Sequence, residues 1–225
     1  MGSGYFGKLP ARADFVIGGC PAGFLKLWEP FLMKGLSQSR LDLNDAWEEA
    51  YMTMPVWRFR LTPEGADGSL KDAVAGALMP SVDRVGRAFP LTLVAGFAPN
   101  KGEAEAEVGW YDKAENLLRG MLSEEADFGA FQQAVDRLED PRAIVGAASV
   151  DETAEFEELP GGEEALHAWF WCRAGERQFA FFSRGLPEAG AFRWLILPEV
   201  FGTSGMEDNA AGNTHGRSHP EDHRT

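Results

Sequence analysis

The chain has 225 residues, of which 44% are hydrophobic and 12% aromatic, so it can bury a substantial core and most of it should be globular rather than disordered. Its net charge of −14 comes almost entirely from residues 101–164, which carry 18 acidic and 5 basic side chains. Such a segment repels phosphate backbones and anionic lipid, which argues against nucleic-acid binding and a membrane-surface role. Two interpretations stay open: a solubilising helical face, and a surface that docks a basic protein.

Residues 4–19 mix short apolar pairs with glycine, proline and charge, and predict a strand that leads into an ordered loop. After Pro21, apolar side chains recur at three-and-four spacing from Phe24 to Leu36 and predict a helix, with Pro30 as a candidate kink. Asn44 is predicted to cap a second short helix that ends before Pro55.

The hydrophobic period then changes to two. Residues 56–61 place Trp57, Phe59 and Leu61 on one side and alternate them with Arg58 and Arg60, which is typical of a strand with one buried face. The apolar runs 73–79 and 89–97 predict two more strands. The stretch between them has the length of a hairpin-like link, with a bulge or a longer excursion as the alternatives.

The second half of the chain repeats this mixture of elements. Helical spacing predicts helices over 110–122 and 128–138, the second capped by Asp127. Residues 150–164 contain acidic side chains and no base, and predict an exposed linker or loop. Residues 168–182 predict a hairpin that turns at Gly175, and 194–197 a further strand.

Helices and at least five strands in mixed order predict an α/β domain in which helices cover a mixed, largely antiparallel sheet. We expect one domain over residues 1–202. The composition of residues 203–225 is polar and without apolar period, and predicts a disordered tail that contains histidines.

The two cysteines, Cys20 and Cys172, lie far apart and form no CxxC motif, which fits a reducing compartment. No apolar run approaches the roughly 18 residues that span a bilayer. We therefore expect a cytoplasmic protein with no membrane insertion.

The common catalytic motifs are missing from the sequence, which has no GxSxG, no GxxxxGK[ST], no GxGxxG and no HExxH. His167 heads an apolar strand and is interpreted as structural. The tail histidines His215, His219 and His223 would share one helical face, but a glycine and a proline among them oppose a helix. We expect no catalytic residues, no metal site and no cofactor.

One set of charged residues stands apart, because its members lie in loops punctuated by glycine and proline. The set is Lys8, Arg12, Asp14, Asp83, Arg84 and Arg87. If the loops converge, the four bases form a patch that suits an acidic or phosphorylated partner. Alternatively, an aspartate neutralises an arginine and fixes the loop, and removing one member of such a buried pair costs about 3–5 kcal/mol.

Three blocks of the sequence resemble the TagF family of accessory proteins of bacterial type VI secretion: GYFGKLPARADFV at 4–16, PVWRF at 55–59 and MPSVDRVGRAFPLTL at 79–93. The resemblance extends over roughly residues 4–200. One departure is Ala13, which precedes Asp14 where the family often has glycine.

The resemblance implies a three-layer α/β/α sandwich and a non-enzymatic, post-translational repressor of type VI secretion that binds and sequesters a forkhead-associated scaffold protein. One rival is a hydrolase or phosphate-handling accessory enzyme with a pocket near Asp14, Asp83 and Arg87. Another is a structural adaptor of the secretion machine that binds through acidic helices around Glu124 and Glu125.

Overall fold

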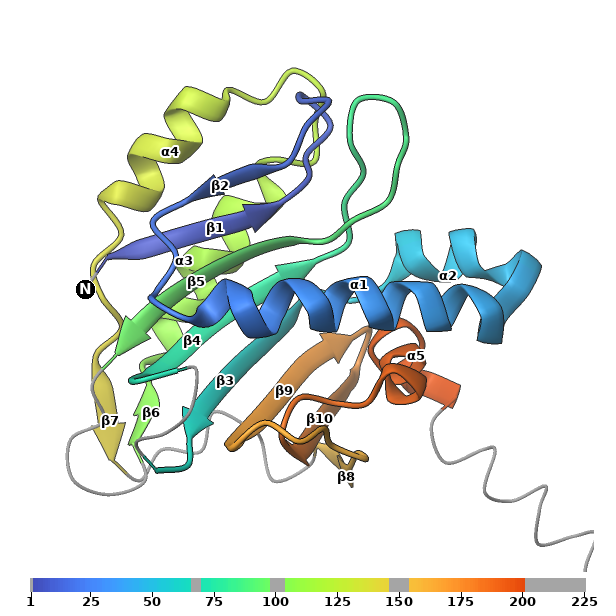
Figure 1. The fold of residues 1–225 in the computed structure, drawn as a ribbon. Coiled ribbons are helices and arrows are strands. Elements are labelled where there is room, and N and C mark those ends of the chain that lie inside the picture. Colours follow the sequence, from blue (N-terminus) through green and yellow to red (C-terminus); the bar gives the residue numbers. More distant parts are fainter. Residues whose placement is uncertain (1, 66–69, 98–103, 146–153, 201–225) are drawn as a thin grey trace, which may run out of the picture.

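The fold is given by a computed structural model that describes residues 2–65, 70–97, 104–145 and 154–200. The strands of its main sheet are β1 (Ser3–Gly7), β2 (Val16–Gly18), β3 (Trp57–Pro63), β4 (Ala73–Met79), β5 (Leu91–Phe97), β8 (Glu155–Glu158), β9 (Leu166–Ala174) and β10 (Arg177–Arg184). They follow the order β2-β1-β5-β4-β3-β9-β10-β8 (Figure 1). Only the β10–β8 pair is parallel, so the predicted α/β class with a mixed, largely antiparallel sheet is confirmed.

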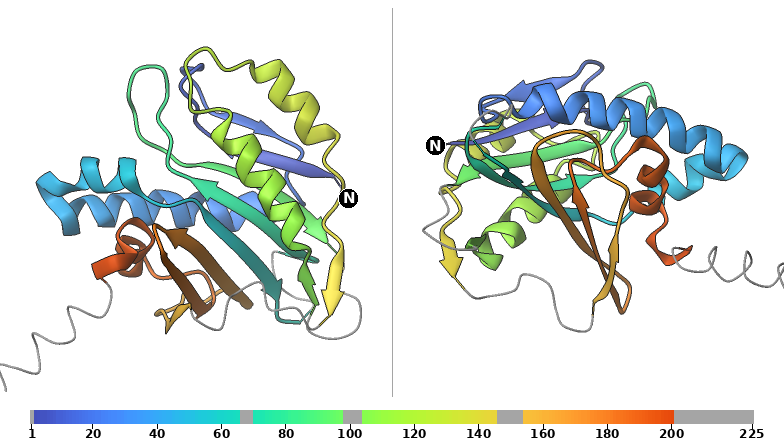
Figure 2. Two further views of the ribbon diagram at one scale, coloured as in Figure 1. Left: turned by 180° about the vertical axis from the view of Figure 1, so that it is seen from behind. Right: turned by 60° about the horizontal axis from the view of Figure 1, so that its bottom comes forward.

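Five α-helices accompany the sheet in the described part of the chain: α1 (Phe24–Leu43), α2 (Trp47–Thr53), α3 (Val108–Arg119), α4 (Phe128–Asp136) and α5 (Phe192–Ile196). Short 3-10 helices lie at Asn44–Ala46, Ala189–Ala191 and Pro198–Val200, and β6 (Ala104–Ala106) pairs with β7 (Ala143–Val145) apart from the main sheet. Seen from behind, α3 and α4 lie in front of the sheet, while α1 crosses its other face (Figure 2). Helices therefore pack on both faces.

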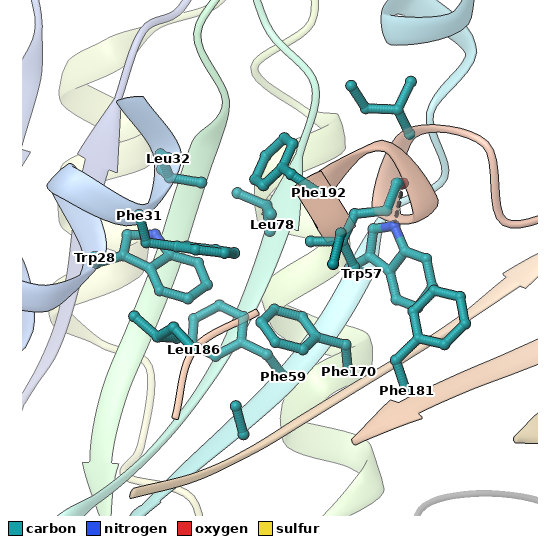
Figure 3. Packing of buried hydrophobic residues seen from close by; sticks show 14 of the residues in the cluster. Trp28, Phe31, Leu32, Trp57, Phe59, Leu78, Phe170, Phe181, Leu186 and Phe192 are labelled. Atoms are coloured by element: carbon teal, nitrogen blue, oxygen red, sulfur yellow. Dashed lines mark hydrogen bonds between the residues drawn. The ribbon is translucent and has the colours of Figure 1, made fainter. Parts of the chain in front are cut away.

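The face beneath α1 is filled by aromatic rings. The rings of Trp28 from α1 and Phe59 from β3 stack with centroids 4.3 Å apart, and Phe170 of β9 packs beside them (Figure 3). Trp57 is also buried there, and its indole N–H donates to the Leu195 carbonyl of α5 at 2.7 Å. These contacts explain the alternating pattern of β3, because every second residue enters this core.

The opposite face carries smaller side chains. Ala75 and Ala77 of β4 are fully buried beneath α3, which contributes Tyr111 and Ala114 to the same cluster. Because both faces of β4 and β5 are covered, every residue of the two strands is buried, as their unbroken apolar runs indicate.

Several predicted elements are confirmed with close bounds. The 73–79 run is β4, the hairpin at Gly175 joins β9 to β10 with a φ of 61° at the glycine, and the Asp127 carboxylate caps α4 by accepting the Ala130 N–H at 3.0 Å. The link between β4 and β5 joins neighbouring antiparallel strands, so the hairpin-like connection is also confirmed.

Three local predictions are wrong. Residues 155–158 of the predicted linker form β8, which gains its backbone partners from β10, and residues 194–197 lie in and just after α5 rather than in a strand. A four-residue apolar run does not distinguish the two structures by its period, and here Phe192 packs against Gly35 of α1 and holds the segment as a helix. Asn44 does not cap with its side chain; it ends α1 with a φ of 45°, which asparagine tolerates.

The tail at residues 203–225, with its three histidines, lies outside the described residues. Within the described part, no helix is both long and apolar enough to cross a membrane.

Candidate functional site

Two loops that are far apart in the sequence meet at one end of the sheet. Residues 8–15 join β1 to β2, and residues 80–90 join β4 to β5; we call these two segments the loop edge (Figure 1). The Arg84 N–H donates to the Arg12 carbonyl at 2.9 Å, which links the loops through their backbones. The loop edge therefore contains all six charged residues singled out in the sequence.

The 80–90 loop forms a tight turn around Asp83. The Asp83 N–H donates to the Arg87 carbonyl at 3.1 Å, and the Gly86 N–H donates to the Asp83 carbonyl at 2.9 Å. Gly86 has a φ of 83°, a left-handed conformation that favours glycine. The Asp83 carboxylate closes the turn, since its Oδ1 accepts the Val85 N–H at 3.0 Å and the Arg87 N–H at 2.9 Å.

The second oxygen of Asp83 is the electrostatic centre of the loop edge. Its Oδ2 accepts from Arg87 Nε at 2.6 Å and lies 3.0 Å from Lys8 Nζ, while the side chain itself is fully buried. Burial raises the pKa of the Asp83 carboxyl, but the Arg87 backbone, the Lys8 and Arg87 side chains and the Val85 backbone outweigh it and hold that pKa well below its usual range. Asp83 is therefore a fixed anion.

Arg87 connects this turn to the first loop. Its Nη2 donates to the Ala13 carbonyl at 2.8 Å, although 62% of its side chain is exposed. Lys8 is nearly covered, and its Nζ lies 5.1 Å from the centroid of the Phe15 ring. One buried carboxylate thus joins two cations, one from each loop.

The structure separates the remaining predicted residues from this centre. Arg12, Asp14 and Arg84 line a surface pocket of about 540 Å³ that neither Asp83 nor Arg87 lines. Arg87 lines a different groove, with Lys8. Of the trio that the enzyme interpretation requires, Asp14 lines the first of these two pockets, Arg87 lines the second, and Asp83 lines neither.

Sequence reasoning missed two structural contacts at the loop edge. The Tyr51 hydroxyl of α2 donates to the Ser81 carbonyl at 2.9 Å and accepts the Ser81 N–H at 3.0 Å, which anchors the start of the 80–90 loop. The ring of Phe15 packs against Phe89 with centroids 4.8 Å apart, and so holds the loops together by apolar contact. An aromatic residue directly after Asp14 was the one available hint of the second contact.

A second ion-pair centre lies on the opposite side of the sheet from α1. Arg58 of β3 donates through Nε to Glu115 at 2.5 Å and through Nη2 to Asp112 at 2.6 Å, both on α3. Burial lowers the pKa of the Arg58 guanidinium, but Glu115 and then Asp112 outweigh that effect and raise it. This centre fixes a helix to the sheet and contains none of the predicted site residues.

The described residues contain no group of three or more histidine, cysteine, aspartate and glutamate side chains that is placed to hold a metal ion. Within the same ranges, His167 pairs with Glu64, its Nε2 lying 2.6 Å from Oε1, and both cysteines are free.

Comparison with known proteins places the chain in a family. A family model described as "TagF N-terminal domain, Type VI secretion system-associated" matches residues 4–138, which is more than half of the sequence. The chain belongs to the TagF family. The crystal structure of PA0076 from Pseudomonas aeruginosa PAO1 is similar to this member at 30% sequence identity and a TM-score of 0.69, covering 88% of this chain and 94% of that one. The search of curated proteins found no match to this chain.

The matched region of this TagF member includes the whole loop edge, β3 and both helices of the α3–α4 face. It ends before β8, β9 and β10. The loop edge is therefore part of the region that defines the family.

Proposed function

We propose that this TagF member is a post-translational negative regulator of type VI secretion, which acts in the cytoplasm by binding and sequestering a forkhead-associated scaffold protein. Membership of a type VI secretion-associated family supports a role in that machine. In this proposal, the helices on the two faces of the sheet form the outer layers of the family's three-layer sandwich.

The observation that carries the proposal is the convergence of the three family-like sequence blocks at one end of the sheet. The first and third blocks contribute the two loops of the loop edge, joined by the Arg84–Arg12 backbone bond. The second block begins β3, where Trp57 is the register partner of Leu78, close to the start of the 80–90 loop. Segments far apart in the sequence thus build one exposed end of the domain, as a binding surface requires.

The chemistry of the loop edge favours binding over catalysis. The Asp83 carboxylate is buried and accepts four hydrogen bonds or ion-pair contacts, so it has neither the access nor the pKa of a general base at neutral pH. We therefore propose a stoichiometric, non-enzymatic mechanism, in which each molecule withholds one scaffold molecule from assembly.

The test combines secretion with direct binding. In the bacterium that encodes this protein, deleting its gene should increase export of the secreted tube protein, and overproducing it should suppress export. The purified protein and scaffold should form a complex of fixed stoichiometry in size-exclusion chromatography with light scattering. Unchanged export in the deletion strain, together with no complex at micromolar concentrations, would falsify the proposal.

A further inference from the structure

A groove beside the loop edge exposes large apolar side chains. Met33 of α1, Met52 of α2 and Phe15 of the first loop are each about half exposed and line one groove of about 710 Å³. Val85 is 66% exposed and precedes Gly86 and Arg87, which line the same groove. Exposed apolar residues that gather around one groove mark a site of interaction, and methionines adapt readily to a partner's side chains.

Among the cations of the loop edge, Lys8 and Arg87 line this groove, and Arg12 and Arg84 line the neighbouring pocket, which shares Phe15 with it. Arg12, Arg84 and Arg87 are all exposed on the loop edge. The two loops carry four basic and two acidic side chains, and one of the acids, Asp83, is buried between Lys8 and Arg87. The loop edge is thus locally positive on a chain whose net charge is −14.

We propose that the loop edge and this groove form a docking site for an acidic protein segment that also carries apolar side chains. The segment's carboxylates pair with Arg84, Arg12 and the free N–H groups of Arg87, because guanidinium groups bind carboxylates in two-pronged geometry. Its apolar side chains enter the groove between Met33, Met52 and Phe15. The inference rests on the proposed function in one respect: the scaffold protein is the expected bearer of the segment.

Charge favours a protein segment over a membrane as the occupant. At physiological salt, charges are screened beyond about 8 Å, so a short segment at the loop edge responds mainly to the local arginines. An anionic bilayer extends past the whole molecule and also meets the acidic surface that gives the chain its net charge of −14.

The site is also held in one conformation before binding. The Asp83 contacts fix the 80–90 turn, Tyr51 fixes its start, and Arg87 ties it to Ala13. A preformed site loses little conformational freedom on binding, so more of the contact energy appears as affinity.

The decisive experiment uses charge reversal and apolar removal at side chains that do not join the two loops to each other; the Arg12 guanidinium packs over the Phe128 ring of α4, with its carbon 4.9 Å from the ring centroid. Arg12 and Arg84 join the loops through backbone atoms, so the double variant Arg12→Glu, Arg84→Glu keeps that bond. Val85→Ser removes an exposed apolar side chain. Arg142→Glu and Leu41→Ser are the matched controls, because Arg142 is exposed near β7 and Leu41, at 68% exposure, matches Val85 at 66%.

Two probes are used with each full-length variant. The first is the purified scaffold protein, followed by calorimetry. The second is a fluorescent 12-residue peptide that alternates glutamate with phenylalanine and leucine, and its binding is followed by anisotropy. Two comparisons are used: a peptide in which serine replaces the apolar residues, and vesicles of phosphatidylglycerol. Circular dichroism and Tm confirm that each variant is folded.

We expect the arginine double variant to weaken peptide and scaffold binding by about tenfold or more and Val85→Ser by several-fold, with both controls unchanged. The serine peptide should bind more weakly than the apolar one. If the scaffold binds the wild type and the arginine double variant equally well, the docking site is wrong while the proposed function stands.

If the scaffold does not bind at all, the peptide still decides the inference. Peptide binding that the loop-edge variants weaken supports the docking site without the proposed function, whereas no peptide binding overturns the site. Vesicle binding that needs the same arginines, without peptide binding, also overturns it in favour of a lipid surface.

Discussion

The two ion-pair centres of this protein are opposite in design. At the loop edge the acid is inside: Asp83 is fully buried and two bases approach it from different loops. On the α3 face a base is at the centre: Arg58, with 19% of its side chain exposed, pairs with two acids of one helix, Glu115 with 18% and Asp112 with 57% exposed.

The difference lies in what else holds each region. Asp83 also accepts two backbone N–H groups, so it determines the conformation of its own turn as well as the pairing of two loops. Arg58 joins β3 to α3. Buried residues of this helix, such as Tyr111 and Leu118, already hold it against the sheet by apolar contact. We infer that the loop edge depends on its charges, whereas the α3 face depends on its apolar contacts.

Replacing Asp83 should therefore have the largest effect of any single charge substitution. Asp83→Asn keeps the side-chain shape but leaves the nearly buried Lys8 ammonium without its counter-charge. We expect Tm to fall by about 10 °C, since breaking a buried pair is strongly destabilising in a chain of this length. Differential scanning calorimetry measures the shift.

Asp14→Asn is the control for that measurement, because Asp14 is exposed on the same edge. Its Tm should stay within about 1 °C of the wild type. Equal effects of the two substitutions would show that the buried carboxylate has no special role and would remove the contrast between the two centres.

The pH dependence of stability should carry the same signature. The folded-state pKa of Asp83 lies below its ordinary value of 3.8, so the native state favours the carboxylate. The contribution of the Asp83 carboxylate to stability is fully present when the pH lies above the ordinary pKa, and it is lost as the pH falls below about 4 toward the lower folded-state pKa. The Tm difference between wild type and Asp83→Asn should be constant from pH 5 to 7 and shrink on further acidification; a difference that grows with acid contradicts the assignment.

Much of the fold could be predicted from the sequence, because its strands and helices have strong local patterns. The apolar run at 73–79 identified β4 with the same bounds, and the alternation at Trp57, Phe59 and Leu61 identified β3 with small errors at its ends. The failures at 155–158 and 194–197 have a common cause: each segment takes its structure from a distant partner, β10 in one case and α1 in the other.

The site could be predicted only in part. Glycine and proline around Lys8, Arg12, Arg84 and Arg87 marked the right loops, but which charges meet depends on the antiparallel pairing of β1 with β5, which brings positions 8 and 83 together. The Tyr51–Ser81 and Arg58–Glu115 contacts join residues 30 and 57 positions apart, and no local pattern encodes them.

At the second centre, Glu115→Gln should have an intermediate effect. Glu115 is mostly covered and accepts from Arg58 Nε, so losing its charge should lower the free energy of unfolding by about 1–2 kcal/mol. Urea denaturation measures this difference. The control is Glu124→Gln, because Glu124 is exposed in the loop that follows α3. A loss as large as that of Asp83→Asn would show that α3 relies on charge after all.

Asp112→Asn should have the smallest effect on stability. It distinguishes the contribution of bond length to the strength of an ion pair from the contribution of burial. Its bond to Arg58 Nη2 is nearly as short as that of Glu115, 2.6 Å against 2.5 Å, but more than half of the Asp112 side chain meets water. Exposed ion pairs contribute at most about 1 kcal/mol because solvent screens them. The loss should therefore stay below that of Glu115→Gln in urea denaturation and shrink further in 0.5 M salt; equal losses would mean that bond length rather than burial sets the strength of these pairs.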